Sequence, residues 1–139
     1  MKKNEQAGRL LALDIGNTTV GVGVFDGRTI VRDWKIRSDS EKTADEYGVL
    51  LVGLLAGAGL GAESIAHVIL SSVVPPLTPA FQSLSRSLFG VKPVVVGPGL
   101  KTGMPILYEN PQEVGADRIV AAVAAFDKHG GPCIVVDFG

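Results

Sequence analysis

Three consecutive β-strands are predicted by residues 9–37, RLLALDIGNTTVGVGVFDGRTIVRDWKIR. The run 9–15 is apolar enough for a buried strand, and 19–25 alternates small and apolar residues, as a second strand does. Asp26-Gly27 is a strong hairpin signal and predicts a third, antiparallel strand over 28–37. A Rossmann domain would start β-α-β, with its Gly-rich turn before a helix. Here the glycine turn separates two strands, which argues against that fold.

Helices and strands alternate after this opening. Thr43 and Glu46 have the spacing of a capping box. The helix that follows carries an apolar face at helical spacing, formed by Tyr47, Leu50, Leu51, Leu54, Leu55 and Ala58. A buried strand is then predicted over 65–70, and a loop over 71–76.

A second helix is predicted after that loop, with Thr78 as its N-cap and Pro79 at its first position. Its buried stripe comprises Leu77, Phe81, Leu84 and Leu88. A short strand over 93–96 and an irregular loop over 97–107 come next.

A third helix is predicted from Asn110, with Pro111 next to it and Glu113 three residues on. Its apolar face consists of Ile119, Val123 and Phe126. A final buried strand is predicted over 132–137, with Cys133 as a small core residue. A buried strand at the end of a chain leaves its neighbours uncovered, so we expect a truncated chain.

The predicted order β-β-β-α-β-α-β-α-β indicates an α/β protein with a mixed sheet and helices on its faces. Apolar residues make up 46% of the 139 residues and charged residues 19%, which suits a packed core. The net charge of −1 provides no basic field for nucleic acid or an anionic membrane. One cysteine and a polar start without a signal or membrane segment predict a soluble cytoplasmic protein with a loose tail over 1–8.

A first candidate site follows the first strand, in DIGNTTVG at 14–21. A carboxylate at the end of a buried strand, as at Asp14, is costly unless it serves a ligand or a hydrogen-bond network. Gly16 allows phosphate to approach the backbone, whose N–H groups can form an anion nest. Asp14 could also hold Mg²⁺ through water. The alternative is an ordinary hairpin turn.

A second candidate site is EVGADR at 113–118, early in the third helix. Gly115 within a helix costs about 1 kcal/mol relative to Ala, which close approach of a ligand or a second backbone would justify. Asp117 is a candidate general base for a substrate hydroxyl, and Arg118 a donor to substrate or phosphate. The alternative is a solvated acidic helix start favoured by the helix dipole.

Asp137 places another carboxylate at the end of an apolar run. Two strand-end aspartates that face one cleft would suit a metal-nucleotide site. The letters Asp-Phe-Gly at 137–139 do not indicate a protein kinase, because no Gly-rich loop, strand lysine or His-Arg-Asp run precedes them. His67 and His129 are interpreted as surface or capping residues.

Five motifs together resemble the type III pantothenate kinases in order and spacing. They are DIGNT at 14–18, SSVVP at 71–75, ENP at 109–111, GADR at 115–118 and VVDFG at 135–139. The resemblance covers nearly the whole chain after the tail. It implies an actin-like (ribonuclease H-like) domain over 9–110, with a second similar domain starting at 111–139.

The resemblance also implies roles for individual residues. The first phosphate loop, which binds ATP, would comprise Asp14, Ile15, Gly16, Asn17, Thr18, Thr19, Val20 and Gly21. Pantothenate would be bound by Tyr108, Gly115, Ala116, Asp117 and Arg118, with Asp117 as the base. Asp137 would be a ligand of a monovalent cation, K⁺ or NH₄⁺. The family is homodimeric and converts ATP and pantothenate to ADP and 4′-phosphopantothenate, the entry step to coenzyme A.

The sequence departs from the family's pattern at its end, because members are roughly twice as long and continue into a Thr-rich second phosphate loop. Phosphoryl transfer depends on positioning and charge neutralisation, so we expect the 139 residues alone to be inactive. Three other functions stay open at this point. They are another phosphotransferase of the same superfamily, a non-catalytic regulatory or binding relative, and a bare structural domain.

Overall fold

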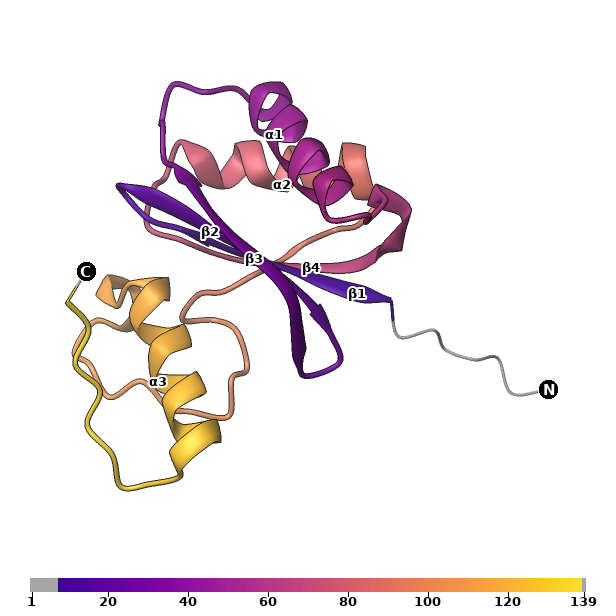
Figure 1. Ribbon diagram of the computed structural model, residues 1–139. Coiled ribbons are helices and arrows are strands. Elements are labelled where there is room, and N and C mark those ends of the chain that lie inside the picture. Colours follow the sequence, from indigo (N-terminus) through magenta and orange to yellow (C-terminus); the bar gives the residue numbers. More distant parts are fainter. Residues whose placement is uncertain (1–7, 139) are drawn as a thin grey trace.

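The computed structural model describes residues 8–138, so the predicted tail over 1–8 lies outside the described residues except for Gly8. One mixed sheet forms the centre of the molecule, with the strand order β3-β2-β1-β4-β5 (Figure 1). The strands are β1 (Arg9–Ile15), β2 (Thr19–Asp26), β3 (Thr29–Arg37), β4 (Ile65–Ser72) and β5 (Val94–Val95). The first three strands pair antiparallel, and β1, β4 and β5 run parallel.

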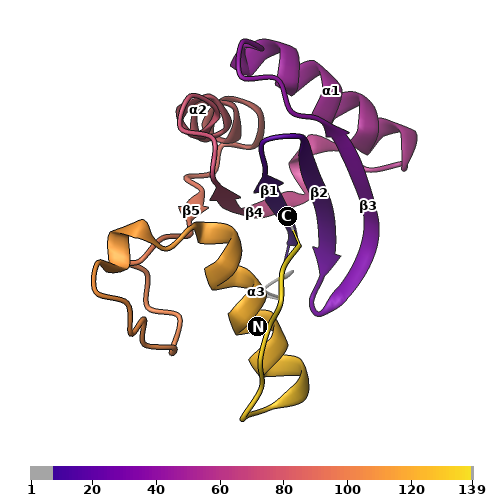
Figure 2. The same cartoon turned by 90° about the vertical axis from the view of Figure 1, so that its left-hand side faces the viewer.

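The helices cover both faces of the sheet. α1 (Ala44–Gly57) and α2 (Leu77–Phe89) lie on one face, and α3 (Ala116–His129) lies on the other (Figures 1 and 2). Short 3₁₀ turns occur at η1 (Ala62–Ser64) and η2 (Pro111–Glu113). The α/β class and the mixed sheet are confirmed. None of the helices within residues 8–138 is both long and apolar enough to cross a lipid bilayer.

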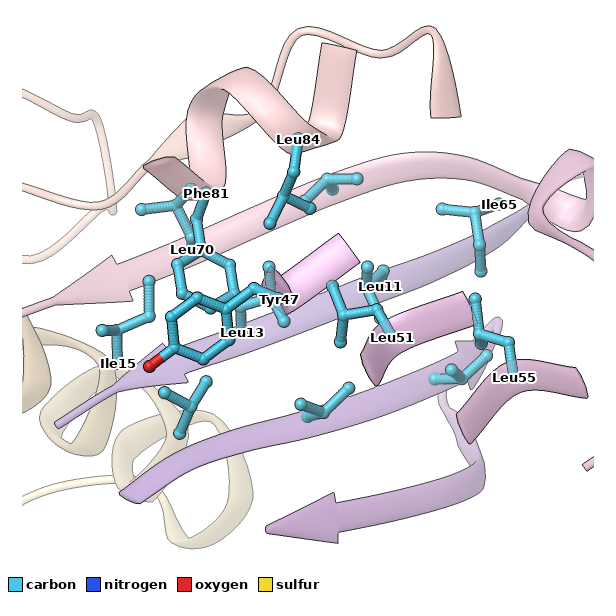
Figure 3. Packing of buried hydrophobic residues seen from close by; sticks show 14 of the residues in the cluster. Leu11, Leu13, Ile15, Tyr47, Leu51, Leu55, Ile65, Leu70, Phe81 and Leu84 are labelled. Carbon is cyan, nitrogen blue, oxygen red and sulfur yellow. The ribbon is translucent and has the colours of Figure 1, made fainter. Parts of the chain in front are cut away.

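The main core lies between the sheet and the helices α1 and α2 (Figure 3). Alternate residues of each strand point into it, so Leu11, Leu13 and Ile15 of β1 meet Leu51 of α1 and Phe81 of α2. The capping box of Thr43 and Glu46 is confirmed. Leu50, expected on the buried face, is 40% exposed because it lies on the flank of α1.

Tyr47 joins this core to a loop near the end of β3. Its side chain is fully buried, and its ring lies 4.7 Å from that of Phe81 between centroids. The Tyr47 hydroxyl accepts a hydrogen bond from the Asp39 backbone N–H at 2.8 Å and donates one to the Asp39 carbonyl at 3.1 Å. One buried hydroxyl therefore forms hydrogen bonds with both the N–H and the carbonyl group of Asp39.

We expect Tyr47→Phe to destabilise the protein by about 1–2 kcal/mol, because the ring stays packed while both backbone groups of Asp39 lose their partner. Chemical denaturation followed by circular dichroism measures this free energy of unfolding. Tyr108→Phe is the matched control, since Tyr108 is 55% exposed. A Tyr47→Phe variant as stable as the parent protein would contradict the role of the hydroxyl.

The β2–β3 hairpin contains one register shift. Phe25 pairs with Ile30, but Val24 pairs with Arg32, so Val31 forms a β-bulge. Past the bulge, Val22 lies opposite Trp34 and Gly21 lies opposite Lys35. Because neighbours along a strand point to opposite faces, the bulge determines which side chains of β3 face α3.

A smaller core holds α3 against the sheet. Ala116 and Ile119 are buried against Val96, which follows β5, and Ile69 of β4 packs against the same cluster. Near the other end of the helix, Asp127 forms an exposed ion pair with Arg28 of the β2–β3 turn at 2.6 Å. The assignment of 111–139 to a second domain stays a proposal.

The predicted final strand is wrong. The segment 132–138 forms no strand and is exposed along its length, with Ile134 93% and Val136 69% exposed. It runs alongside α3, where no strand within residues 8–138 offers it ladder hydrogen bonds (Figure 2). Cys133 is therefore exposed and is not the core residue that its apolar neighbours suggested.

Two predicted helix starts also need correction. α2 begins at Leu77 after Pro76, so the Thr78 hydroxyl does not cap it and instead hydrogen-bonds Ser72 Oγ at 2.8 Å. Asn110 does cap a turn, through the Gln112 N–H at 3.2 Å, but this turn is η2. α3 begins five residues later than predicted, at Ala116 and not at Pro111, because the intervening backbone at Val114 and Gly115 is extended. Phe126, assigned to the buried face, is 54% exposed.

Candidate active site

The turn between β1 and β2 forms a tight loop with free donors at its tip. The Gly16 N–H donates to the Thr19 carbonyl at 3.0 Å, and a Cβ on Gly16 would lie 3.1 Å from that oxygen. Asn17 and Thr18 are exposed, and their backbone N–H groups make no hydrogen bond within residues 8–138. Consecutive free N–H groups of this kind suit an anion such as phosphate.

The loop that follows β3 lies beside this turn. The Ser38 N–H donates to the Thr18 carbonyl at 2.9 Å. A polar cavity of about 420 Å³ lies between Asn17, Val74 and the 37–40 segment, which Tyr47 holds through Asp39. The anchored loop therefore supports the turn from the side of α1.

The start of α3 packs against the end of β4. Gly115 is the N-cap of α3 rather than an interior residue, with φ −63° and ψ 142°. The Asp117 carboxylate folds back over it, so a Cβ on Gly115 would lie 2.6 Å from Asp117 Oδ1 and 3.7 Å from Val73 Cγ1. Val73 in turn donates its N–H to the Ile15 carbonyl at 3.0 Å. Val73 therefore lies between the end of β1 and the start of α3, where Asp117 stands.

Burial and two neighbouring charges act on the Asp14 carboxyl at this place. Partial burial raises the pKa of Asp14, and the negative charges of Asp117 and Asp137 raise it further. Repulsion of this kind requires the carboxylates to be near each other. Within residues 8–138, however, no three His, Cys, Asp or Glu side chains lie close enough to hold one ion together. The site thus concentrates negative charge around Asp14, but the described side chains do not form a cluster of metal ligands.

The raised pKa of Asp14 has a consequence for stability. A carboxyl whose pKa is higher in the folded than in the unfolded state destabilises the protein when ionised, and this cost disappears as the pH falls through the folded pKa. We therefore expect Asp14→Asn to raise the melting temperature at pH 7 and to lose this advantage near pH 4. Thermal melts across this range measure the difference, which is small because Asp14 remains partly exposed to solvent.

Asp33→Asn is the control for removing one negative charge from the same face of the sheet. A melting temperature of Asp14→Asn below that of the parent at pH 7 would refute the repulsion.

A second cavity lies between the sheet and α3, and we call it the sheet cavity. Its volume is about 350 Å³, and Asp14, Ser71 and Val120 are among its lining residues. Ser71 is 95% buried, and its Oγ has no hydrogen-bond partner among residues 8–138. Parallel pairing places Ser71 directly beside Asp14, and antiparallel pairing places Gly21 on the other side, next to Lys35. The sequence alone did not identify Ser71 and Lys35 as site residues. Only the register of the strands shows that these two residues lie in one row with Asp14 and Gly21.

The residues predicted to bind substrate are not all brought together. Ala116 is buried in the small core, whereas Arg118 is exposed and lines a groove of about 550 Å³ that Asp137 also lines. Tyr108 is 55% exposed and lines neither this groove nor the sheet cavity. Their role in binding therefore stays a prediction.

Fold and site together define the chain as an α/β domain with one mixed sheet and a tight loop after its first strand that suits an anion. The family model described as type III pantothenate kinase matches residues 10–139. The type III pantothenate kinase of Geobacter sulfurreducens is 55% identical over 130 residues, covering 94% of this chain and 51% of the relative. Type III pantothenate kinase 2 of Symbiobacterium thermophilum is 52% identical over 129 residues, with 93% and 49% covered.

The chain therefore belongs to the type III pantothenate kinase family. It spans about half the length of the curated relatives that it matches. Among solved structures, a ROK hexokinase from Thermus thermophilus aligns with a TM-score of 0.42 and 18% identity, covering 63% of this chain and 32% of that chain.

Proposed function

We propose that the full-length protein transfers a phosphoryl group from ATP to pantothenate and forms 4′-phosphopantothenate, the first step of coenzyme A synthesis. Family membership supports the reaction. The observation that carries the proposal is the position of Val73, whose N–H bonds Ile15 in the phosphate loop and whose side chain lies near Gly115. It brings the loop close to Asp117, and donor phosphate and acceptor base must share one region. Two such groups on opposite sides of the molecule could not act on one phosphoryl group.

Each residue has a proposed role in this reaction. The loop 14–21 binds the ATP phosphates through its backbone N–H groups, and Asp117 accepts the proton of the attacking hydroxyl late in transfer. Arg118 and Tyr108 contact pantothenate, together with the backbone of 115–116. No covalent intermediate with the protein is needed, since positioning and charge compensation supply most of the catalysis.

The residues at the end of β1 fit a hydrated Mg²⁺. Asp14 offers one carboxylate and Ser71 Oγ an unpartnered buried oxygen, and Mg²⁺ is typically bound by few carboxylates while it keeps several waters. When bound, Mg²⁺ neutralises phosphate charge. Asp137 is proposed as one ligand of a monovalent cation, K⁺ or NH₄⁺. Its negative charge raises the pKa of Asp14, which supports this proposal.

The test is an assay of the full-length protein with ATP and a panel of alcohols that includes pantothenate and simple sugars. We expect ADP release that depends on pantothenate, with 4′-phosphopantothenate detected by mass spectrometry. Turnover with another alcohol but not with pantothenate would show that the proposed substrate is wrong. Binding of a partner without any turnover would show that the protein is regulatory and not an enzyme. The proposal extends to a cytoplasmic homodimer, for which light scattering of the purified protein measures the oligomeric state.

A further inference from the structure

The proposed phosphate site lacks a basic residue of its own. The loop 14–21 contains no Lys or Arg. The site nevertheless gathers the negative charges of Asp14, Asp117 and Asp137, to which a nucleotide would add several more. Unpaired charges of one sign in a partly desolvated site are costly, so a basic side chain nearby would add to the neutralisation that bound cations supply.

Lys35 is the one basic side chain among the described residues that line the sheet cavity. It belongs to β3, and strand pairing aligns Ser71, Asp14, Gly21 and Lys35 in one row across four neighbouring strands. All four face α3, on the side of the sheet opposite the main core.

Gly21 leaves the space between Asp14 and Lys35 open. Neighbouring strands lie about 4.8 Å apart, so the backbone of Lys35 is roughly 10 Å from that of Asp14. A side chain at position 21 would stand between them, and a Cβ there would already contact the Cβ of Asp14 at 3.6 Å. With glycine in place, the flexible four-carbon stem of Lys35 can extend over β2 toward Asp14.

The charges around Lys35 favour this direction. Asp33, two residues earlier on β3, faces the same cavity, and Asp14 lines it from β1. Asp117 of α3 and Asp137 of the C-terminal segment add further negative charge near Asp14. The unpartnered hydroxyl of Ser71, buried at the far end of the row, is a second sign that this row is completed by a ligand.

We propose that Lys35 extends across Gly21 and binds the terminal phosphate group of the nucleotide. This inference rests on the proposed function, because it assumes that a nucleoside triphosphate occupies the site. Lys35 contributes a charge-assisted hydrogen bond to phosphate and no contact to the nucleoside.

The experiment measures binding to the full-length protein by calorimetry, with two probes: the magnesium complex of β,γ-imido-ATP, and adenosine. In Lys35→Met we expect the affinity for the triphosphate analogue to fall at least about tenfold, the size of one charge-assisted hydrogen bond, and the affinity for adenosine to stay unchanged. Lys35→Arg should restore most of the lost affinity. Arg32→Met is the matched control, because Arg32 is a basic residue of the same strand on the opposite face, over the ring of Trp34 at 5.6 Å.

Unchanged analogue affinity in Lys35→Met would overturn the inference. An equal loss for adenosine and the analogue would also overturn it, because the effect would then come from altered packing and not from phosphate. If the parent protein binds the analogue but does not phosphorylate pantothenate, the proposed function fails while the affinities still decide the role of Lys35. A parent protein that binds no triphosphate would overturn both.

Discussion

Asp117→Asn in the full-length protein is expected to lower kcat about 1,000-fold, within the range that a general base contributes. The structure separates this effect from misfolding, because Asp117 Oδ1 accepts the Arg118 backbone N–H at 2.9 Å and the amide oxygen of Asn keeps that bond. Equilibrium affinity for ATP should stay unchanged, since the proposed role concerns the acceptor hydroxyl. Single-turnover kinetics with pantothenate measure the chemical step.

The matched control is Asp127→Asn at the other end of α3, which removes a carboxylate of the exposed pair with Arg28. Exposed pairs of this kind contribute little, so this variant should keep its activity and nearly all its stability. An Asp117→Asn variant that retains parental turnover would exclude Asp117 as the base.

Gly115→Ala is expected to lower kcat about 100-fold, the effect of displacing a catalytic group by about 1 Å. The added Cβ would lie 2.6 Å from Asp117 Oδ1, so the carboxylate must move. The backbone at Gly115 has a φ of −63°, which alanine adopts readily, and we expect a loss of stability below about 1 kcal/mol for the poorer N-cap. Parallel measurements of kcat and of unfolding distinguish the two effects.

Gly53→Ala in α1 provides the comparison, because a Cβ there meets nothing within 4 Å. It should stabilise the helix by about 0.5–1 kcal/mol and leave kcat alone. If Gly115→Ala were fully active, the carboxylate of Asp117 would tolerate displacement, and its position could not be catalytically important.

The sheet and its main core could be predicted from the sequence, because they depend on local patterns. The alternation in β1 and β2, the Asp26-Gly27 turn and the capping box at Thr43 each act over a few residues. The last third of the chain was predicted less well. The segment 132–138 has the composition of a buried strand, but a strand also requires a neighbour that composition does not reveal.

The two clusters of the candidate site were also visible in the sequence, as Asp14 at a strand end and Asp117 near a helix start. What could not be predicted is how they are joined. Their connection depends on Val73, whose backbone bonds Ile15 and whose side chain lies near Gly115. Such a contact is set by the parallel pairing of β1 with β4, and no short-range signal reports it.

The face of the sheet on which Lys35 lies could not be predicted from the sequence either. Continuing the pairing of Asp26 with Thr29 without interruption would place Trp34 opposite Gly21 and turn Lys35 toward the main core. The bulge at Val31 shifts the pairing by one residue. No residue in the hairpin indicates the bulge, because Val is common in regular strands.

Because of the bulged residue Val31, the number of residues in the hairpin determines which side chains of β3 lie on the same face as Asp14. In a homologous chain with one more residue between the hairpin turn and Trp34 and no second bulge, the pairing would place Trp34 opposite Gly21 and exchange the two surfaces of the strand, so that the indole would lie on the side of Asp14 and the Lys35 ammonium among aliphatic side chains. A chain that lacks the bulged residue could instead pair regularly and keep Trp34 opposite Val22. Loss of one residue at the bulge should therefore be better tolerated than an insertion in this hairpin.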